Sequence, residues 1–104
     1  MKCLVLVVVG CICAPGFAAD PDWLLEGKAA WQARDSQAEL VFGDRLWVMG
    51  GWFNSYEAPP RDVWSSGDGR AWKLVSKEAP WLHSDLPMSL AFGGKMWVMG
   101  GWYN

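Results

Sequence analysis

Residues 40–54 read LVFGDRLWVMGGWFN, and this stretch returns fifty positions later as LAFGGKMWVMGGWYN at residues 90–104. Most positions are identical, and the differences are conservative, such as Arg45 to Lys95 and Phe53 to Tyr103. Internal repeats with a period of about 50 residues are typical of proteins in which each unit forms one four-stranded blade of a β-propeller. The repeat therefore predicts an all-β fold of antiparallel, four-stranded blades.

Short apolar runs separated by glycine turns predict the strands of each blade. The runs are apolar on both faces, as expected for sheets that are covered on both sides, and Gly43-Asp44 supplies the positive φ angles that a tight hairpin needs. Gly93-Gly94 repeats this turn in the second copy. The predicted strands are residues 37–42, 45–50, 61–66, 71–75, 88–92 and 95–100.

The repeat divides the chain into units that do not complete a propeller. We define unit one as residues 31–81, a whole blade, and unit two as residues 82–104, the first half of a blade. Residues 20–30 precede them, and because Trp23 matches Trp72 they predict a last strand that completes a blade from the other end of a ring. Since a blade cannot stand alone, the sequence predicts either a truncated coding sequence or copies that assemble into a ring.

The first 19 residues, MKCLVLVVVGCICAPGFAA, have the features of a secretory signal peptide. A lysine precedes an apolar run that is too short for a membrane span, and small residues precede Asp20. The predicted location is secreted or periplasmic. A lipoprotein signal with Cys11 as the acylated residue is the alternative. All three cysteines lie in this segment, so cleavage would leave no disulfide framework.

The spaced tryptophans, glycines and acidic residues of unit one resemble the kelch motif, in the form found in exported bacterial proteins that are similar to the central domain of galactose oxidase. The residues that carry this resemblance are Phe42-Gly43, residues 46–51, Asp62-Val63-Trp64, Asp68-Gly69 and Trp72. A competing resemblance is the Asp-box hairpin of sialidases, which Ser66, Asp68, Gly69 and Trp72 approach with one residue missing. That family does not explain the glycine pair at residues 50–51.

The long loops of such a blade emerge at one end, and they predict a binding face there. Connections one-to-two and three-to-four are minimal, whereas residues 52–60 and 76–87 are long, and long loops on a rigid scaffold carry binding residues. Aromatic rings at this end would stack on sugars or contact a protein, and their alternative role is packing between loops and neighbouring blades. Arg34 would pair with a carboxylate, and its alternative role is a buried hydrogen bond to a loop carbonyl. The predicted ligand-binding residues are Trp31, Arg34, Trp52, Phe53, Asn54, Tyr56, Trp102 and Tyr103.

Catalytic chemistry finds little support in the sequence. The resemblance to galactose oxidase implies a copper site built from a cysteine-linked tyrosine and histidines, yet the processed chain would have one histidine, His83, and no cysteine. Asp68 before Gly69 is typical of a turn. We therefore expect no cofactor, no metal and no enzymatic activity. The net charge of −2 argues against nucleic acid or an anionic membrane surface as partner.

Three functions follow from these expectations. The first is an exported, non-catalytic recognition module that binds protein or carbohydrate, with a homo-oligomer if the chain is complete. The second is a truncated remnant without independent function. The third is the beginning of a propeller enzyme, either sialic-acid-processing or oxidase-like, whose catalytic groups lie elsewhere.

Overall fold

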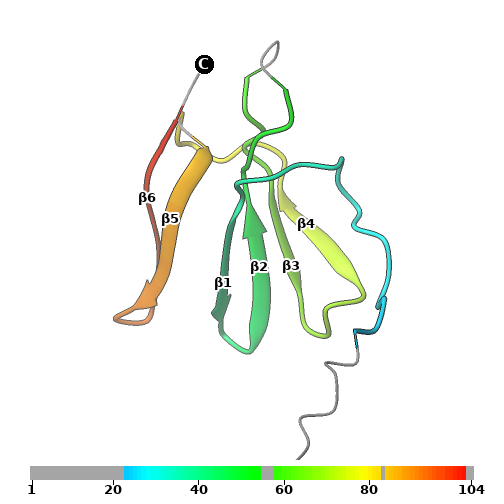
Figure 1. Cartoon of the computed structure of the whole chain (residues 1–104). Coiled ribbons are helices and arrows are strands. Elements are labelled where there is room, and N and C mark those ends of the chain that lie inside the picture. Colours follow the sequence, from blue (N-terminus) through cyan, green and yellow to red (C-terminus); the bar gives the residue numbers. More distant parts are fainter. Residues whose placement is uncertain (1–22, 55–57, 83, 103–104) are drawn as a thin grey trace, which may run out of the picture.

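The structure, a computed structural model, describes residues 23–54, 58–82 and 84–102, and within them the fold is all-β with antiparallel strands and no helix. Strands β1 to β4 form one sheet in sequential order, and β5 and β6 form a second sheet (Figure 1). The strands are β1 Ala38–Phe42, β2 Arg45–Met49, β3 Val63–Ser66, β4 Trp72–Ser76, β5 Asp85–Phe92 and β6 Lys95–Trp102.

The β1–β2 and β5–β6 hairpins match in detail. Gly43 and Asp44 have φ angles of 57° and 54°, and Gly93 and Gly94 have 60° and 69°. Positive φ at both central residues defines the type I′ turn, whose twist fits that of the flanking strands. In both hairpins an indole Nε1 donates to the carbonyl five residues earlier at 2.9 Å, from Trp47 in the first and from Trp97 in the second. The sequence repeat is therefore also a structural repeat.

The core of the molecule lies where the two sheets meet. Ala38 and Met49, which are paired across β1 and β2, are each only 2% exposed, and Val63 and Ala79 are buried beside them. Trp81 from the linker and Val98 from β6 pack against this group. The two repeated hairpins thus belong to separate sheets that pack together, which rules out one continuous sheet for them.

The observed strands differ from the predicted ones in the linker before β5 and in the segment before unit one. The sequence predicts a loop over residues 76–87, but Ser76 still belongs to β4, and β5 begins at Asp85, which pairs with Trp102. Pro87 is compatible with β5 because this strand lies at the edge of its sheet, where a missing N–H is tolerated. Residues 23–30 form no strand here, and Trp23, Leu24 and Leu25 are exposed. Their predicted role in closing a ring concerns a neighbour beyond this chain and stays a prediction.

The predicted signal peptide, residues 1–19 with Cys11, lies outside the described residues, as do Tyr56, His83 and Tyr103. In the part of the chain that the structure describes, no helix has the length and apolar character needed to cross a membrane.

Candidate interaction site at the loop end

The Gly50-Gly51 pair joins three segments where the chain leaves β2. The amide of Gly50 donates to the Asp62 carbonyl at 3.1 Å, and the amide of Gly51 donates to the Ser84 carbonyl at 2.7 Å. A Cβ on Gly50 would lie 2.6 Å from the Ser84 carbonyl oxygen, and a Cβ on Gly51 would lie 2.6 Å from that of Asp35. Glycine is therefore required here both for the positive φ angles, 60° and 109°, and for the close approach of backbone.

The buried side chain of Arg34 stabilises the same junction at Gly50-Gly51. Its side chain is 1% exposed, and its guanidinium donates to the Gly50 carbonyl at 2.9 Å and to both carboxylate oxygens of Asp62 at 2.5 and 2.9 Å. The Trp64 indole also donates to Asp62, at 2.8 Å. Because a bidentate guanidinium–carboxylate pair fixes both position and orientation, this network holds the start of β3 against the end of β2.

Arg34 therefore does not lie on the surface as an anchor for a ligand carboxylate. The structure places it in its alternative role, a buried side chain bonded to a loop carbonyl, and adds the carboxylate of Asp62 as its partner. In the sequence, Asp62 is marked only by its place in the Asp62-Val63-Trp64 stretch that carries the kelch resemblance, and nothing local identifies Arg34 as its partner.

The acid sensitivity of the fold should depend in part on Asp62. Burial raises the pKa of its carboxyl, but the hydrogen bonds from Arg34 and Trp64 and the charge of Arg34 lower the pKa more, so that it lies below the ordinary 3.8. A carboxyl with a depressed folded-state pKa contributes stability above its unfolded pKa, and this stability is lost as the pH falls through the folded value.

We expect the free energy of unfolding to decrease when the pH is lowered from about 5 to about 3, with a shallower decrease in Asp62→Asn. Urea denaturation at a series of pH values measures both slopes. Asp68, whose pKa is lowered by the amides of Ala71 and Arg70 and by the Ser66 hydroxyl, titrates in the same window and leaves a residual slope in the variant. An Asp62→Asn slope equal to that of the wild type would contradict the role of the pair.

The remaining predicted binding residues fall into two groups. Trp31 packs against Trp64 of β3 and Trp72 of β4, with ring centroids 5.5 and 5.0 Å from its own, so it covers this half of its sheet. The residues after each glycine pair stay at the loop end: Trp52, Phe53 and Asn54 are half-buried, and Trp102 is 65% exposed.

Trp52 and Trp102 occupy equivalent positions on neighbouring segments. Trp52 exchanges two backbone hydrogen bonds of 2.9 Å with Asp35. Fifty positions later, Trp102 lies opposite Asp85 in the register of β5 and β6. The amide of Leu86 donates to the Ser36 carbonyl at 3.0 Å, which brings the two pairs beside each other. In Figure 1 the loop after β2 and the end of β6 accordingly rise at the same end of the molecule.

Asp68 builds the turn at the opposite end of the sheet. Its carboxylate accepts the amides of Arg70 and Ala71 at 2.9 and 2.8 Å, and the Trp72 indole donates to the Gly69 carbonyl at 3.1 Å. The turn role expected for Asp68 thus accounts for its contacts.

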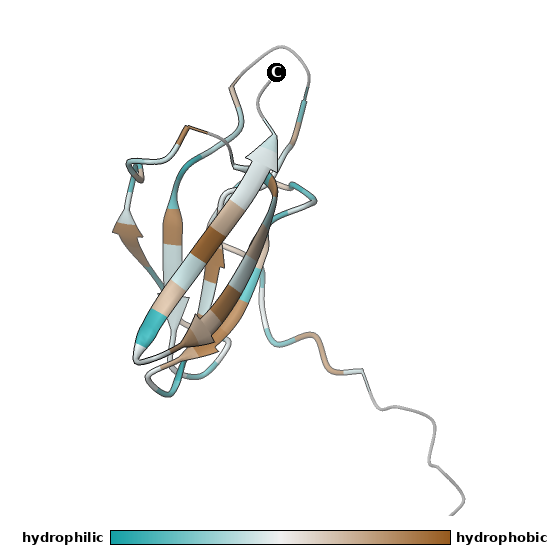
Figure 2. Cartoon of the chain, turned by 90° about the vertical axis from the view of Figure 1, so that its left-hand side faces the viewer, coloured by the Kyte–Doolittle hydropathy of each residue, from teal (hydrophilic) through white to brown (hydrophobic). Residues whose placement is uncertain are grey.

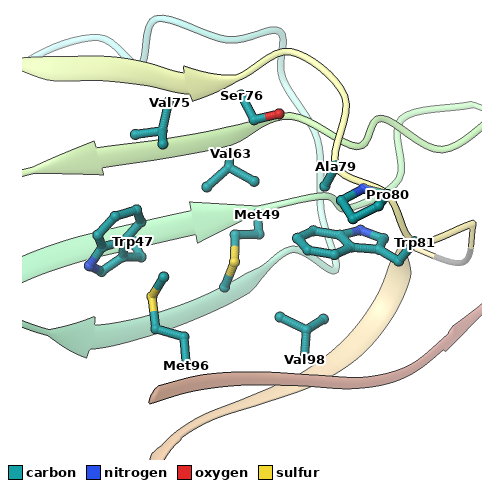
Figure 3. Close-up of a pocket in the computed structure, with 10 residues that line it drawn as sticks. All are labelled: Trp47, Met49, Val63, Val75, Ser76, Ala79, Pro80, Trp81, Met96 and Val98. Carbon is teal, nitrogen blue, oxygen red and sulfur yellow. The ribbon is translucent and has the colours of Figure 1, made fainter. Parts of the chain in front are cut away.

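A second feature is an apolar groove of about 340 Å³ between the two sheets. Side chains from β2, β6 and the linker point into it, and it extends over β3 and β4 (Figure 3). Its lining consists of Trp47, Met49, Val63, Val75, Ser76, Ala79, Pro80, Trp81, Met96 and Val98. The groove lacks charged groups, so it offers burial for apolar surface and no acid–base chemistry.

No family model and no curated protein matches the chain. Among the residues described, no group of three or more histidine, cysteine and acidic side chains is arranged to hold a metal ion.

Proposed function

We propose that this chain is an exported, non-catalytic recognition module of kelch-type propeller blades that binds a protein or a carbohydrate at its loop end. The kelch interpretation is supported by the 50-residue repeat and by the sequential antiparallel order of β1 to β4. The matching type I′ hairpins in two packed sheets support it further. Export is inferred from residues 1–19.

The observation that carries the binding role is the rigid junction beneath the loop-end aromatics. Gly50-Gly51, Arg34 and Asp62 tie three segments together with buried hydrogen bonds directly beside Trp52. An aromatic ring held on a fixed backbone loses little conformational entropy when it binds, and its face packs on sugar rings or apolar side chains. Trp102 extends this surface onto unit two.

Replacing Trp102 by alanine should weaken binding about tenfold, because loss of one stacked aromatic costs about 1.4 kcal/mol. The assay is a titration against immobilised galactose, sialyllactose, chitotriose and cellotriose, followed by isothermal calorimetry with the glycan that binds.

The matched control is Trp23→Ala, which removes a tryptophan that is 88% exposed and distant from the glycine junction in the sequence. We expect it to bind as the wild type does. Equal losses in the two variants would contradict the loop end as the site, and an absence of binding to every glycan would exclude carbohydrates of these types as ligands.

A further inference from the structure

The face of unit one that unit two covers is made of four side chains on one side of the β1–β2 hairpin. The strand register pairs Ala38 with Met49 and Leu40 with Trp47, so all four point to the same side. We call this side of each hairpin its front face. It packs against Val98 and, around the apolar groove, against Met96.

The same front face recurs on unit two fifty positions later, where it is exposed. Its side chains are paired in the same way, Met88 with Met99 and Leu90 with Trp97. Their exposed fractions are 66% for Met88, 37% for Met99, 42% for Leu90 and 45% for Trp97. Apolar bands run along this hairpin in the view that faces it (Figure 2).

We call the opposite side of each hairpin its back face. Unit two packs on unit one through its back face, and side chains on the back face of the hairpin in unit one are exposed. Val41 and Leu46 are paired across the hairpin and are 64% and 40% exposed. Their equivalents in unit two are Ala91 and Met96. Met96 lies against unit one, as described above. Trp31 covers the part of the back face of unit one that β3 and β4 form, so the described chain exposes the front face of unit two and the β1–β2 part of the back face of unit one.

The second glycine pair provides an independent sign of the same interface. Gly100 and Gly101 keep positive φ angles of 70° and 99°, close to those of Gly50 and Gly51. A Cβ on Gly50 would strike the Ser84 carbonyl of the following unit, whereas a Cβ on Gly100 would meet nothing within 4 Å. Gly100 and Gly101 thus have the backbone conformation that accommodates the next unit at Gly50 and Gly51, although the described residues contain no unit after unit two.

We propose that copies of this chain associate head to tail, with the front face of unit two in one copy packed on the back face of unit one in the next. Within the chain, the Gly51 amide donates to the Ser84 carbonyl. Between copies, the Gly101 amide would donate to the Arg34 carbonyl of the next copy, because Gly101 and Arg34 are the residues fifty positions from Gly51 and Ser84. Such an interface is heterologous, so it closes into a ring or continues as a filament. The proposal depends on the repeat and not on the ligand of the loop end.

One internal contact is not reproduced between copies. Ser89 donates from its hydroxyl to the Glu39 carbonyl at 2.9 Å, and the residue equivalent to Ser89 in unit one is Glu39 itself. A carboxylate cannot donate to a carbonyl, so the interface between copies lacks this hydrogen bond and brings the charged Glu39 to its apolar contact. We therefore expect the association to be weaker than the internal packing and to depend on concentration.

Sedimentation velocity of the purified chain and of two charged variants tests the proposal. We expect the wild type to form oligomers at about 100 µM, and Leu90→Lys on the front face and Val41→Lys on the back face each to abolish association, since a lysine would be buried unpaired. Leu82→Lys, at a position in the linker that is 65% exposed, should associate as the wild type does.

An experiment that mixes the two variants distinguishes the head-to-tail interface from other modes of association. Leu90→Lys keeps an intact back face and Val41→Lys keeps an intact front face, so an equimolar mixture should form a one-to-one dimer and no larger species. A monomeric wild type, a monomeric mixture, or loss of association in Leu82→Lys would overturn the proposal. Circular dichroism confirms folding, and Leu90→Ser and Val41→Ser, which perturb less, should weaken association in the same pattern.

Discussion

Arg34→Ala is expected to lower the free energy of unfolding by about 3–5 kcal/mol, because removing one partner of a buried ion pair leaves the other charge uncompensated. The Asp62 carboxylate, whose side chain is 16% exposed, would lose both of its guanidinium hydrogen bonds, and the Gly50 carbonyl would lose one. Urea denaturation followed by tryptophan fluorescence measures the change.

Two further variants show whether the effect comes from the buried network. Arg70 pairs with Glu26, but its side chain is 65% exposed, so solvent screens the pair and Arg70→Ala should destabilise the chain far less than Arg34→Ala. Arg34→Lys keeps the charge and loses the bidentate fork, and it should lie between Arg34→Ala and the wild type. If Arg34→Ala were no more destabilising than Arg70→Ala, the buried pair would not be what fastens the junction.

The hairpins could be predicted from the sequence because their signals are local. Glycine or aspartate at two consecutive positions between apolar runs indicates a type I′ turn, and Gly43, Asp44, Gly93 and Gly94 all adopt the required positive φ. The repeat then placed matching hairpins at both positions. All-β structure with antiparallel strands is confirmed by the structure, whereas the kelch-type blade remains our proposal.

The contacts of the loop end could not be predicted because they join residues far apart in the sequence. Arg34 and Asp62 are 28 positions apart, and nothing in either local sequence says that they pair. The perpendicular contact between the rings of Trp31 and Trp72 could not be predicted either, because the two residues are far apart in the sequence. The sequence predicts a loop at residues 85–87 because Pro87 disfavours a central strand, and no local signal shows that β5 lies at the edge of a sheet.

The two glycine pairs allow an internal comparison, since Gly50 and Gly100 have nearly the same φ but different surroundings. An alanine at either position would bear the strain of left-handed backbone, about 1–2 kcal/mol. Only at residue 50 would the new Cβ also meet the Ser84 carbonyl at 2.6 Å, and this carbonyl cannot move away freely because it accepts the Gly51 amide.

Gly50→Ala is therefore expected to destabilise the chain by about 3 kcal/mol or more, whereas Gly100→Ala should stay within about 1–2 kcal/mol when the chain is dilute. Urea denaturation gives both values, and hydrogen exchange at the Gly51 and Leu86 amides should accelerate in Gly50→Ala alone, because those bonds connect the two units. Equal losses in the two variants would mean that backbone strain, and not the approach of Ser84, requires glycine at residue 50.

At concentrations where copies associate, Gly100→Ala should also weaken association, because the new Cβ would then meet the backbone of the next copy, as a Cβ at residue 50 would meet Ser84.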